Sequence, residues 1–293
     1  MTSRTIFSAL LALGVTGGAS AVLADPVDFP APGFRQAAGE PQPMLELTAE
    51  TLGEYAAPEA DQGVAVDGDY FYAVDNHTIA KYARADGSRL AEWNDESGAI
   101  QHLNSCYAAE GLLWCANSNY PDAPMGSSVE VFDADTLEHR ASHSLGMMEE
   151  GSLTWFSPTT TGFIAAFAHY DRNGVDYKDH RYSSLVAFDS EWRRTGGWLF
   201  PVSATERMAP YAASGGAIGP DGRLYVTGHD RPEMYVFEAP QRGPHLVLVA
   251  TIALEIEGQA FSFAPDGNDI FAVDRAAGLV RQIALPQLDP LAD

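Results

Sequence analysis

Five copies of one pattern are the feature of this 293-residue chain that most constrains its fold. Each copy begins with a small or polar residue and an apolar run, turns on Gly or Asp, and continues into an aromatic-rich strand. A unit repeated in this way predicts that each copy buries its apolar face against the next one. The copies are QGVAVDGDYFYAVDN from Gln62, NSCYAAEGLLWCANSN from Asn104, GSLTWFSPTTTGFIAAFAHYD from Gly151, SGGAIGPDGRLYVTGHD from Ser214 and GQAFSFAPDGNDIFAVDR from Gly258.

A third strand follows in every copy, and a fourth strand follows in the first four copies. Sets of four antiparallel strands every ~40–50 residues, with short turns and hardly any helical periodicity, are typical of propeller blades. We therefore predict an all-β fold, a single β-propeller of five blades over residues 43–286. Six blades would follow if the Pro-rich start or residues 170–215 held a further set of strands. Two sandwich domains are the alternative architecture.

The fifth copy ends at Pro286, before a fourth strand can form. The missing strand can come from the N-terminal part of the chain, where residues 45–49 and 54–56 are candidates. Pairing of such a strand with the last copy would join the two ends of the repeat in one blade and close the ring. Residues 25–42, rich in Pro, Gly and Ala, are expected to be a tether or a wrapped arm, and residues 287–293 a tail.

Residues 1–24 have the features of a secretory signal peptide. Arg4 gives a short positive start, residues 6–15 form an apolar core, and small residues lead to a cleavage site expected after Ala24. An uncleaved anchor is the alternative, although the apolar core is short for a bilayer span. We therefore expect a periplasmic or secreted protein that is not inserted in a membrane.

The two cysteines fit an oxidising compartment. Cys106 and Cys115 flank a predicted hairpin that turns at Glu110-Gly111, which places them opposite each other. Directly opposed strand residues lie close enough for a disulfide, and export would favour its formation. Two buried free thiols are the alternative. A metal site that uses both is not expected, because the chain has no further cysteine to complete it.

The charge balance excludes one class of partner. Acidic residues outnumber basic ones 40 to 17, and the formal net charge is −23. A nucleic-acid backbone or an anionic membrane surface would be repelled by such a protein. We expect a monomer whose partner is a small polar or carboxylate-bearing molecule.

Long insertions gather at one face of the predicted ring. The first two strands of a blade are antiparallel, so the start of the first and the end of the second reach the same face. Residues 118–126, 169–181 and 202–213 extend the connections on that side, whereas the opposite side has tight turns such as Asp67-Gly68. Long loops at one end of a rigid scaffold usually mark the functional face.

Three histidines on this face are candidate metal ligands. His102, His169 and His229 come from three consecutive copies, at strand ends that should converge on the axis. Neutral imidazoles suit Zn, Mn, Fe or Cu, so we predict a divalent cation of this kind; Ca, which prefers oxygen ligands, is less favoured. A polar rim that only satisfies backbone groups and water, with no metal, is the alternative.

Other polar residues at the same strand ends are candidates for catalysis and substrate binding. Asp171 or Asp230 would serve as a base or as a partner of a metal ligand, and Arg275 would hold a substrate carboxylate. The expected substrate-binding residues are Gln62, Asn76, Asn104, Asn119, Tyr120, Tyr170 and Gln259.

Several strings resemble a family of exported bacterial β-propellers. They are HLNSC at 102–106, SNYPDAPMGSSVEVFD at 118–133, TLEH at 136–139, GSLTW at 151–155, and SGG with YVTGHDRPE within 214–233. Some members of that family carry the label cycloisomerase. The resemblance implies a propeller fold and export, and it transfers no catalytic residue to this chain.

These features lead to two functional hypotheses. The first is a periplasmic propeller enzyme with a divalent metal at the ring axis, acting on a small polar substrate by lactone hydrolysis, cycloisomerisation or lyase chemistry. The second is a non-catalytic binding module that docks a carbohydrate, peptide or envelope protein on the long-loop face. Its aromatic contact residues would be Tyr120, Tyr170, Tyr177 and Tyr211.

Overall fold

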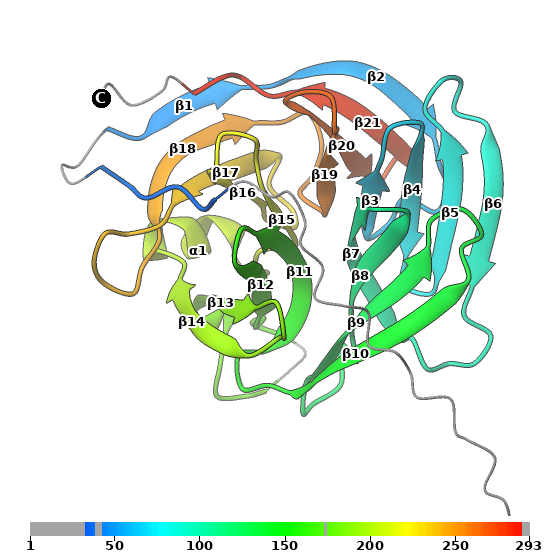
Figure 1. Ribbon diagram of the computed structural model, residues 1–293. Coiled ribbons are helices and arrows are strands. Elements are labelled where there is room, and N and C mark those ends of the chain that lie inside the picture. Colours follow the sequence, from blue (N-terminus) through cyan, green and yellow to red (C-terminus); the bar gives the residue numbers. More distant parts are fainter. Residues whose placement is uncertain (1–32, 39–42, 173–174, 289–293) are drawn as a thin grey trace, which may run out of the picture.

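The computed structural model describes residues 33–38, 43–172 and 175–288. It confirms an all-β propeller, in which five sheets surround one axis (Figure 1). The predicted signal peptide lies outside the described residues. Blade 1 comprises β3 (Gly63–Val66), β4 (Tyr70–Asp75), β5 (Thr78–Ala83) and β6 (Arg89–Asn94). Blade 2 comprises β7 (His102–Ala109), β8 (Leu112–Ser118), β9 (Gly126–Asp133) and β10 (His139–Met147). Blade 3 comprises β11 (Ser152–Thr159), β12 (Gly162–Ala168), β13 (Ser184–Asp189) and β14 (Arg194–Leu199).

The last two blades contain the N-terminal strands. Blade 4 comprises β15 (Gly215–Ile218), β16 (Leu224–Thr227), β17 (Glu233–Glu238) and β18 (Val247–Ala253). Blade 5 comprises β19 (Phe261–Phe263), β20 (Asp269–Asp274) and β21 (Leu279–Ala284), and it is completed by β2 (Glu50–Ala56), which pairs antiparallel with β21. The predicted closure by an N-terminal strand is therefore confirmed. The other candidate, β1 (Leu45–Thr48), instead adds a parallel fifth strand to β18 of blade 4.

The described part of the N-terminal arm lies against blade 4. Gln36 forms an isolated parallel bridge with Ala239, and the Phe34 ring contacts Trp198 edge-on with 5.5 Å between centroids. The Arg35 guanidinium is 3.3 Å from the Glu238 carboxylate, which is nearly fully buried. Residues 33–38 thus follow the ring rather than extend away from it.

The inner strands are buried on both faces, whereas the outer strands alternate. β3 is buried at all four positions, and β2 alternates between exposed and half-buried residues. Small residues allow the inner strands to approach one another at the axis. A Cβ on Gly63 would lie 2.8 Å from the backbone oxygen of Asn104 and 2.9 Å from the Ala260 Cβ, so blades 1, 2 and 5 meet there.

The hairpin of blade 2 confirms the predicted disulfide between Cys106 and Cys115. The two cysteines are register partners with Cα atoms 4.0 Å apart. Glu110 (φ 51°) and Gly111 (φ 76°) form the turn. Positive φ at both central residues matches the twist of the flanking strands, which is why this turn sets the register.

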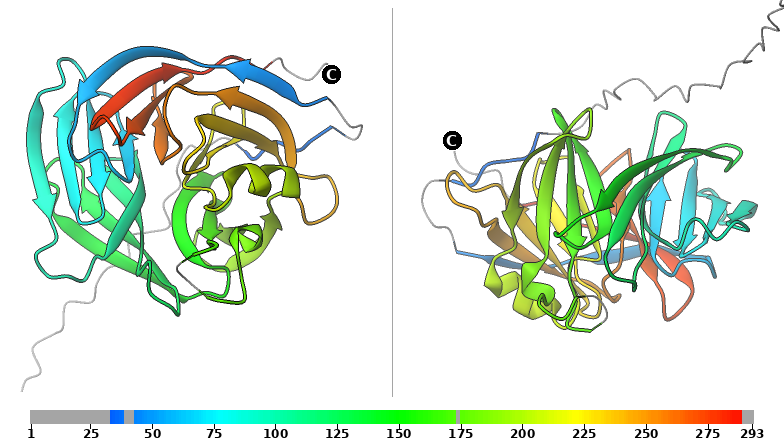
Figure 2. Two further views of the ribbon diagram at one scale, coloured as in Figure 1. Left: turned by 180° about the vertical axis from the view of Figure 1, so that it is seen from behind. Right: turned by 90° about the horizontal axis from the view of Figure 1, so that it is seen from below.

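One short helix, α1 (Val202–Met208), was not predicted. It follows Pro201 in the connection between blades 3 and 4, and Figure 2 shows it at one end of the blades rather than against a sheet face. Ala204, Thr205 and Met208 are its buried residues, and seven residues are too few for a helical period to stand out. A 3-10 turn, η1 (His180–Tyr182), follows Asp179. None of the helices in the described ranges has the length and apolar character needed to cross a membrane.

Candidate active site at the axial face

First-strand starts and second-strand ends lie on the same face of the ring, as predicted. The register pairs Gly63 with Val74 in blade 1 and His102 with Ser118 in blade 2, and the other three blades repeat the arrangement. We call this end of the propeller the axial face. It carries all three predicted metal ligands and most of the predicted substrate-binding residues.

His102 is held by two asparagines from two blades. The Asn76 amide donates to the Asp75 carboxylate at 2.8 Å, which turns its Oδ1 toward the imidazole. His102 Nδ1 therefore donates to Asn76 Oδ1 at 2.5 Å, and its Nε2 is left with the lone pair. Asn104 Nδ2 lies 3.5 Å from that Nε2. The tautomer of His102 is thus fixed by Asn76.

The environment of His102 keeps its imidazole neutral. Burial, with a smaller contribution from His77, lowers the pKa of His102 to about 4. Desolvation acts against the charged form of a base, so the imidazole is uncharged at neutral pH. Beside it, Asn104 is buried and its Oδ1 has no hydrogen-bond partner within the part of the chain that the structure describes. An unpaired buried acceptor costs about 1–3 kcal/mol, which a ligand donor would recover.

Three tyrosines connect His102 to the opposite end of the site. The Tyr120 ring lies 5.2 Å from His102 and 5.0 Å from Tyr170, and Tyr170 lies 6.3 Å from Tyr211. Tyr211 then stacks on His229 at 4.0 Å. Burial raises the pKa of the Tyr170 phenol, so this ring is a neutral, packed element of the row rather than an acid.

His229 and Arg275 form the other end of the site. Arg275 Nη2 lies 3.2 Å from His229 Nε2, while His229 Nδ1 is 2.5 Å from Asp230 Oδ1. Since a guanidinium only donates, Nε2 accepts from Arg275 and Nδ1 carries the proton toward Asp230. The Arg275 Nε is 3.9 Å from the Asp61 carboxylate. Arg275 is half-buried and keeps further N–H donors for an anion.

The described residues do not bring His102, His169 and His229 together as one group of metal-ligating side chains. His102 is engaged with two asparagines, and His229 has both ring nitrogens engaged by Asp230 and Arg275. His169 turns to the junction of blades 2 and 3, where its Nε2 lies 3.1 Å from the Glu149 backbone oxygen. The positions on the strands were predicted, but the neighbouring groups turn the three imidazoles to different partners.

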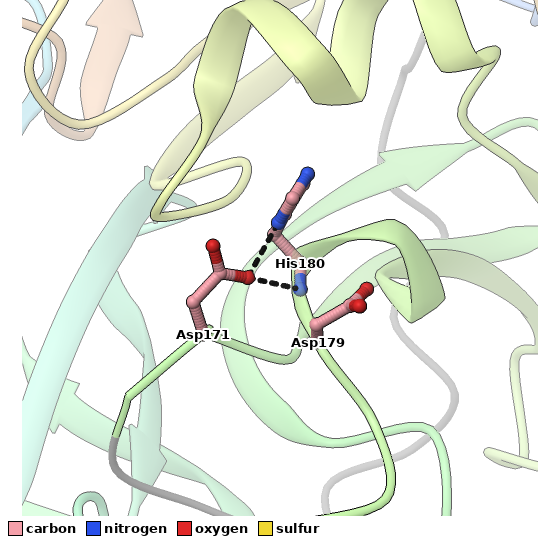
Figure 3. A group of neighbouring side chains, drawn as sticks. All are labelled: Asp171, Asp179 and His180. Carbon is pink, nitrogen blue, oxygen red and sulfur yellow. Dashed lines mark hydrogen bonds and ion pairs between the residues drawn. The ribbon is translucent and has the colours of Figure 1, made fainter.

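The described residues contain one group of three metal-ligating side chains whose donor atoms lie within 4.8 Å of one another: Asp171, Asp179 and His180. Figure 3 shows His180 Nδ1 and its backbone N–H directed to Asp171 Oδ1, at 2.5 and 3.3 Å. Asp179 accepts from the Arg181 guanidinium with both oxygens, which lowers the pKa of its carboxyl to about 2. A cation would therefore compete with Arg181 for Asp179.

The remaining predicted residues have diverse surroundings. Gln62 donates to Asp61 on the axial face, and Asp230 is an exposed partner of His229. Asn119 closes the 118–126 insertion, since its side chain bonds both the Pro124 oxygen and the Gly126 N–H. Gln259 is buried. Its backbone oxygen accepts from Thr227, so the structure assigns it a role between blades 4 and 5.

Two features were missed by sequence reasoning. Asp61, one residue before the first copy, contacts Arg275 across the seam of the ring. Three methionines, Met125, Met147 and Met148, gather beside His169, although they lie in two separate stretches of sequence. The Met147-Met148 doublet and the nearby Met125 were visible signals, but no periodic pattern connects them.

No protein-family model matches the sequence, and the search of curated proteins finds no match. Among solved structures, glutaminyl cyclase from Myxococcus xanthus matches with a TM-score of 0.58 at 10% identity, covering 84% of this chain and 100% of that chain. A luciferin-regenerating enzyme matches at 0.48 and 11% identity (80% and 94% covered), and a gluconolactonase from Xanthomonas campestris at 0.44 and 10% (74% and 68% covered). At such identities the likeness shows the propeller fold alone. Of the resemblance drawn from the sequence, these matches support the propeller fold and neither the exported family nor the cycloisomerase label.

Proposed function

We propose that the axial face binds a small hydroxycarboxylate or its lactone and catalyses proton transfer on it. The observation that carries this proposal is a pair of acceptors on the axial face: His102 Nε2, which receives only a 3.5 Å contact from Asn104 Nδ2, and Asn104 Oδ1, which has no hydrogen-bond partner among the described residues. A substrate hydroxyl or an attacking water would donate to this pair. Arg275, with its remaining N–H groups, would bind the carboxylate.

His102 would act as the general base. Its Nδ1–H is held by Asn76, and its Nε2 carries the lone pair that removes a proton. Because the pKa is about 4, the imidazole is deprotonated at every pH above that value. The base is weak but always available. Hydrolysis of a lactone and proton abstraction next to a carboxylate both use such a group.

In this proposal neither Asp171 nor Asp230 is the base. Asp230 orients His229, which in turn accepts from Arg275 and fixes its guanidinium. Asp171 belongs to the group that could hold a divalent cation, with Asp179 and His180. A cation there would add charge beside the polar cleft of about 320 Å³ that Asp171 and Asp179 line. Asp179 is already bound by Arg181, and the proposed proton transfer is assigned to His102 and Arg275 rather than to this group.

The catalytic proposal is tested with a panel of small hydroxycarboxylates, their lactones and the matched uncharged amides. We expect Arg275→Gln to weaken carboxylate binding about 10- to 100-fold and to leave amide binding unchanged, since a charged hydrogen bond contributes about 1.5–3 kcal/mol. His102→Gln should lower kcat about 100- to 10,000-fold with little effect on binding. The exposed Arg242→Gln, away from the site, is the matched control.

Three results would refute the proposal: no turnover of any panel member, turnover that survives His102→Gln, or a wild-type acid limb of kcat/KM near pH 6.5 rather than near pH 4. The limb reports the essential base of the free enzyme. Metal analysis of protein without a His tag, repeated for Asp171→Asn, tests the cation. A stoichiometric divalent metal that Asp171→Asn loses would place a cation at the Asp171 group.

We also propose that the protein is exported. A signal peptide is predicted, and the Cys106–Cys115 disulfide is of the kind that persists in oxidising compartments. Cell fractionation with N-terminal sequencing tests this. A chain that begins at Met1 in the cytoplasm would contradict it.

A binding module remains the second candidate, because apolar side chains are exposed near the axial loops. Met147 is 72% exposed and Tyr177 is 66% exposed, whereas Tyr170 is packed in the tyrosine row and unsuited to be an anchor. Pull-down with wild type and Tyr177→Ala from an envelope extract tests this role. A partner lost with Tyr177→Ala, together with no turnover of the panel, would favour docking over catalysis.

A further inference from the structure

A small cavity between blades 2 and 3 is lined by three methionines and a histidine. It measures about 60 Å³, and its wall includes Met125, Met147, Met148 and His169. Met125 ends the 118–126 insertion, Met147 ends β10, and His169 follows β12. The Met148 N–H donates to the Met125 oxygen at 3.2 Å, which holds the two methionine segments side by side. The chain has seven methionines, and three of them meet here.

His169 has one nitrogen in use and one without a partner. The side chain is buried, with 3% of the residue exposed. A carbonyl oxygen can only accept, so Nε2 carries the proton that is donated to Glu149 at 3.1 Å. In the neutral ring, Nδ1 then holds a lone pair, and this buried atom has no hydrogen-bond partner among the residues that the structure describes. Metal-bound histidines usually have this arrangement, with the second nitrogen donating to a backbone carbonyl.

The ligand types favour a soft cation. Thioether sulfur selects Cu(I), whereas Zn is usually bound by imidazole, thiolate and carboxylate groups, and Mg and Ca prefer oxygen ligands. Packing does not explain Met147, because it is a large apolar side chain with 72% exposure.

We propose that Met125, Met147, Met148 and His169 bind one Cu(I) ion. The thioether sulfurs and His169 Nδ1 are the donors, and Glu149 fixes the tautomer of His169 through its backbone oxygen. This site shares no residue with the axial proton-transfer site, which consists of His102, Asn104 and Arg275. His169, predicted from the sequence as a ligand of a divalent cation, is thus assigned to monovalent copper and to different neighbours.

Ag(I), which has the same ligand preference and no second common oxidation state, is the probe for the full-length protein. We expect one Ag(I) per chain in native mass spectrometry and in calorimetric titration. The double variant Met125→Leu/Met148→Leu should bind Ag(I) more than about tenfold more weakly, because ligand loss exceeds the typical effect of losing an outer contact. Leucine replaces methionine at little cost in packing, and an unchanged urea midpoint will show that the fold is kept. His169→Gln should weaken Ag(I) binding similarly.

Met44→Leu changes a methionine outside the cavity and should bind Ag(I) as the wild type does. His102→Gln and Arg275→Gln should also keep Ag(I) binding, so failure of the axial site would not affect this result. The proposal is overturned if the wild type binds no stoichiometric Ag(I), if the folded double variant binds Ag(I) with wild-type affinity, or if equimolar Zn(II) displaces it.

Discussion

His102 makes the stability of the ring depend on pH. Its folded pKa is about 4, against about 6.5 for an unperturbed imidazole. Between these values the unfolded chain binds a proton that the folded chain does not, so protons stabilise the unfolded state. The contribution of neutral His102 to the free energy of unfolding is fully present above about pH 6.5 and is lost as the pH falls toward 4.

The size of this effect follows from the two pKa values. At pH 7 the unfolded imidazole is mostly neutral, so keeping His102 neutral in the folded state costs little free energy. At pH 5 the unfolded imidazole is almost fully protonated while the folded one is not, and the difference between the two pH values is about 2 kcal/mol. Burial also lowers the pKa of His169 and His143, so both act in the same direction.

The measurement is urea unfolding of wild type and His102→Gln at pH 7 and pH 5, with the disulfide intact. The variant has no imidazole at this position, so its loss of unfolding free energy over the interval should be smaller by about 2 kcal/mol. Gln62→Ala, which changes a polar residue of the same face that does not titrate, should show the wild-type pH dependence. Equal losses for wild type and His102→Gln, or an NMR titration of His102 near pH 6.5, would refute the assignment of a buried neutral imidazole.

Three further outcomes are expected from the fold. Replacing both Cys106 and Cys115 by Ser should lower the unfolding free energy by about 2–3 kcal/mol because a ring of about ten residues is opened, and an unchanged urea midpoint would contradict this. A chain that begins at Gln62 lacks β1 and β2, leaves β21 and β18 as open edges, and should aggregate or melt well below a chain beginning at Asp25; equal melting temperatures would show that β2 closes nothing. Gly162→Ala should cost more than about 2 kcal/mol, because Gly162 has φ +148° and a Cβ would collide with the Phe188 oxygen, whereas Gly53→Ala, where a Cβ meets open space, should be nearly neutral in the same unfolding assay.

The ring was predictable because local sequence patterns mark where the strands of each blade begin and end. A turn such as Glu110-Gly111 fixes the register of its hairpin, and a strand buried on both faces reads as a continuous apolar run. The parallel pairing of β1 with β18 was not predictable in the same way. It depends on an edge created by residues about two hundred positions away, and no local pattern in Leu45–Thr48 specifies it.

The site was predictable in position but not in orientation. His102 lies at the start of a first strand, and His169 and His229 follow the ends of second strands, which places all three at the axial face. The direction of each ring is set by neighbours from other segments. Asn76 holds the first, the Glu149 carbonyl the second, and Arg275 the third. Such partners follow from tertiary packing, which strand periodicity does not encode.

The pairing of the N-terminal strands β1 and β2 with blades 4 and 5 also sets the order in which the ring can be assembled. Of the described strands these are the first to be synthesised, but their partners β18 and β21 lie near the other end of the chain. Blades 1 to 3 contain only strands that are neighbours in sequence, so each can form as soon as it emerges. Glu50–Ala56 must wait unpaired until Leu279–Ala284 arrives, and joining the two requires closing a loop of more than two hundred residues. We expect closure of blade 5 to be the slow, last step of folding, and the waiting N-terminal segment to be the part of the nascent chain most in need of a chaperone.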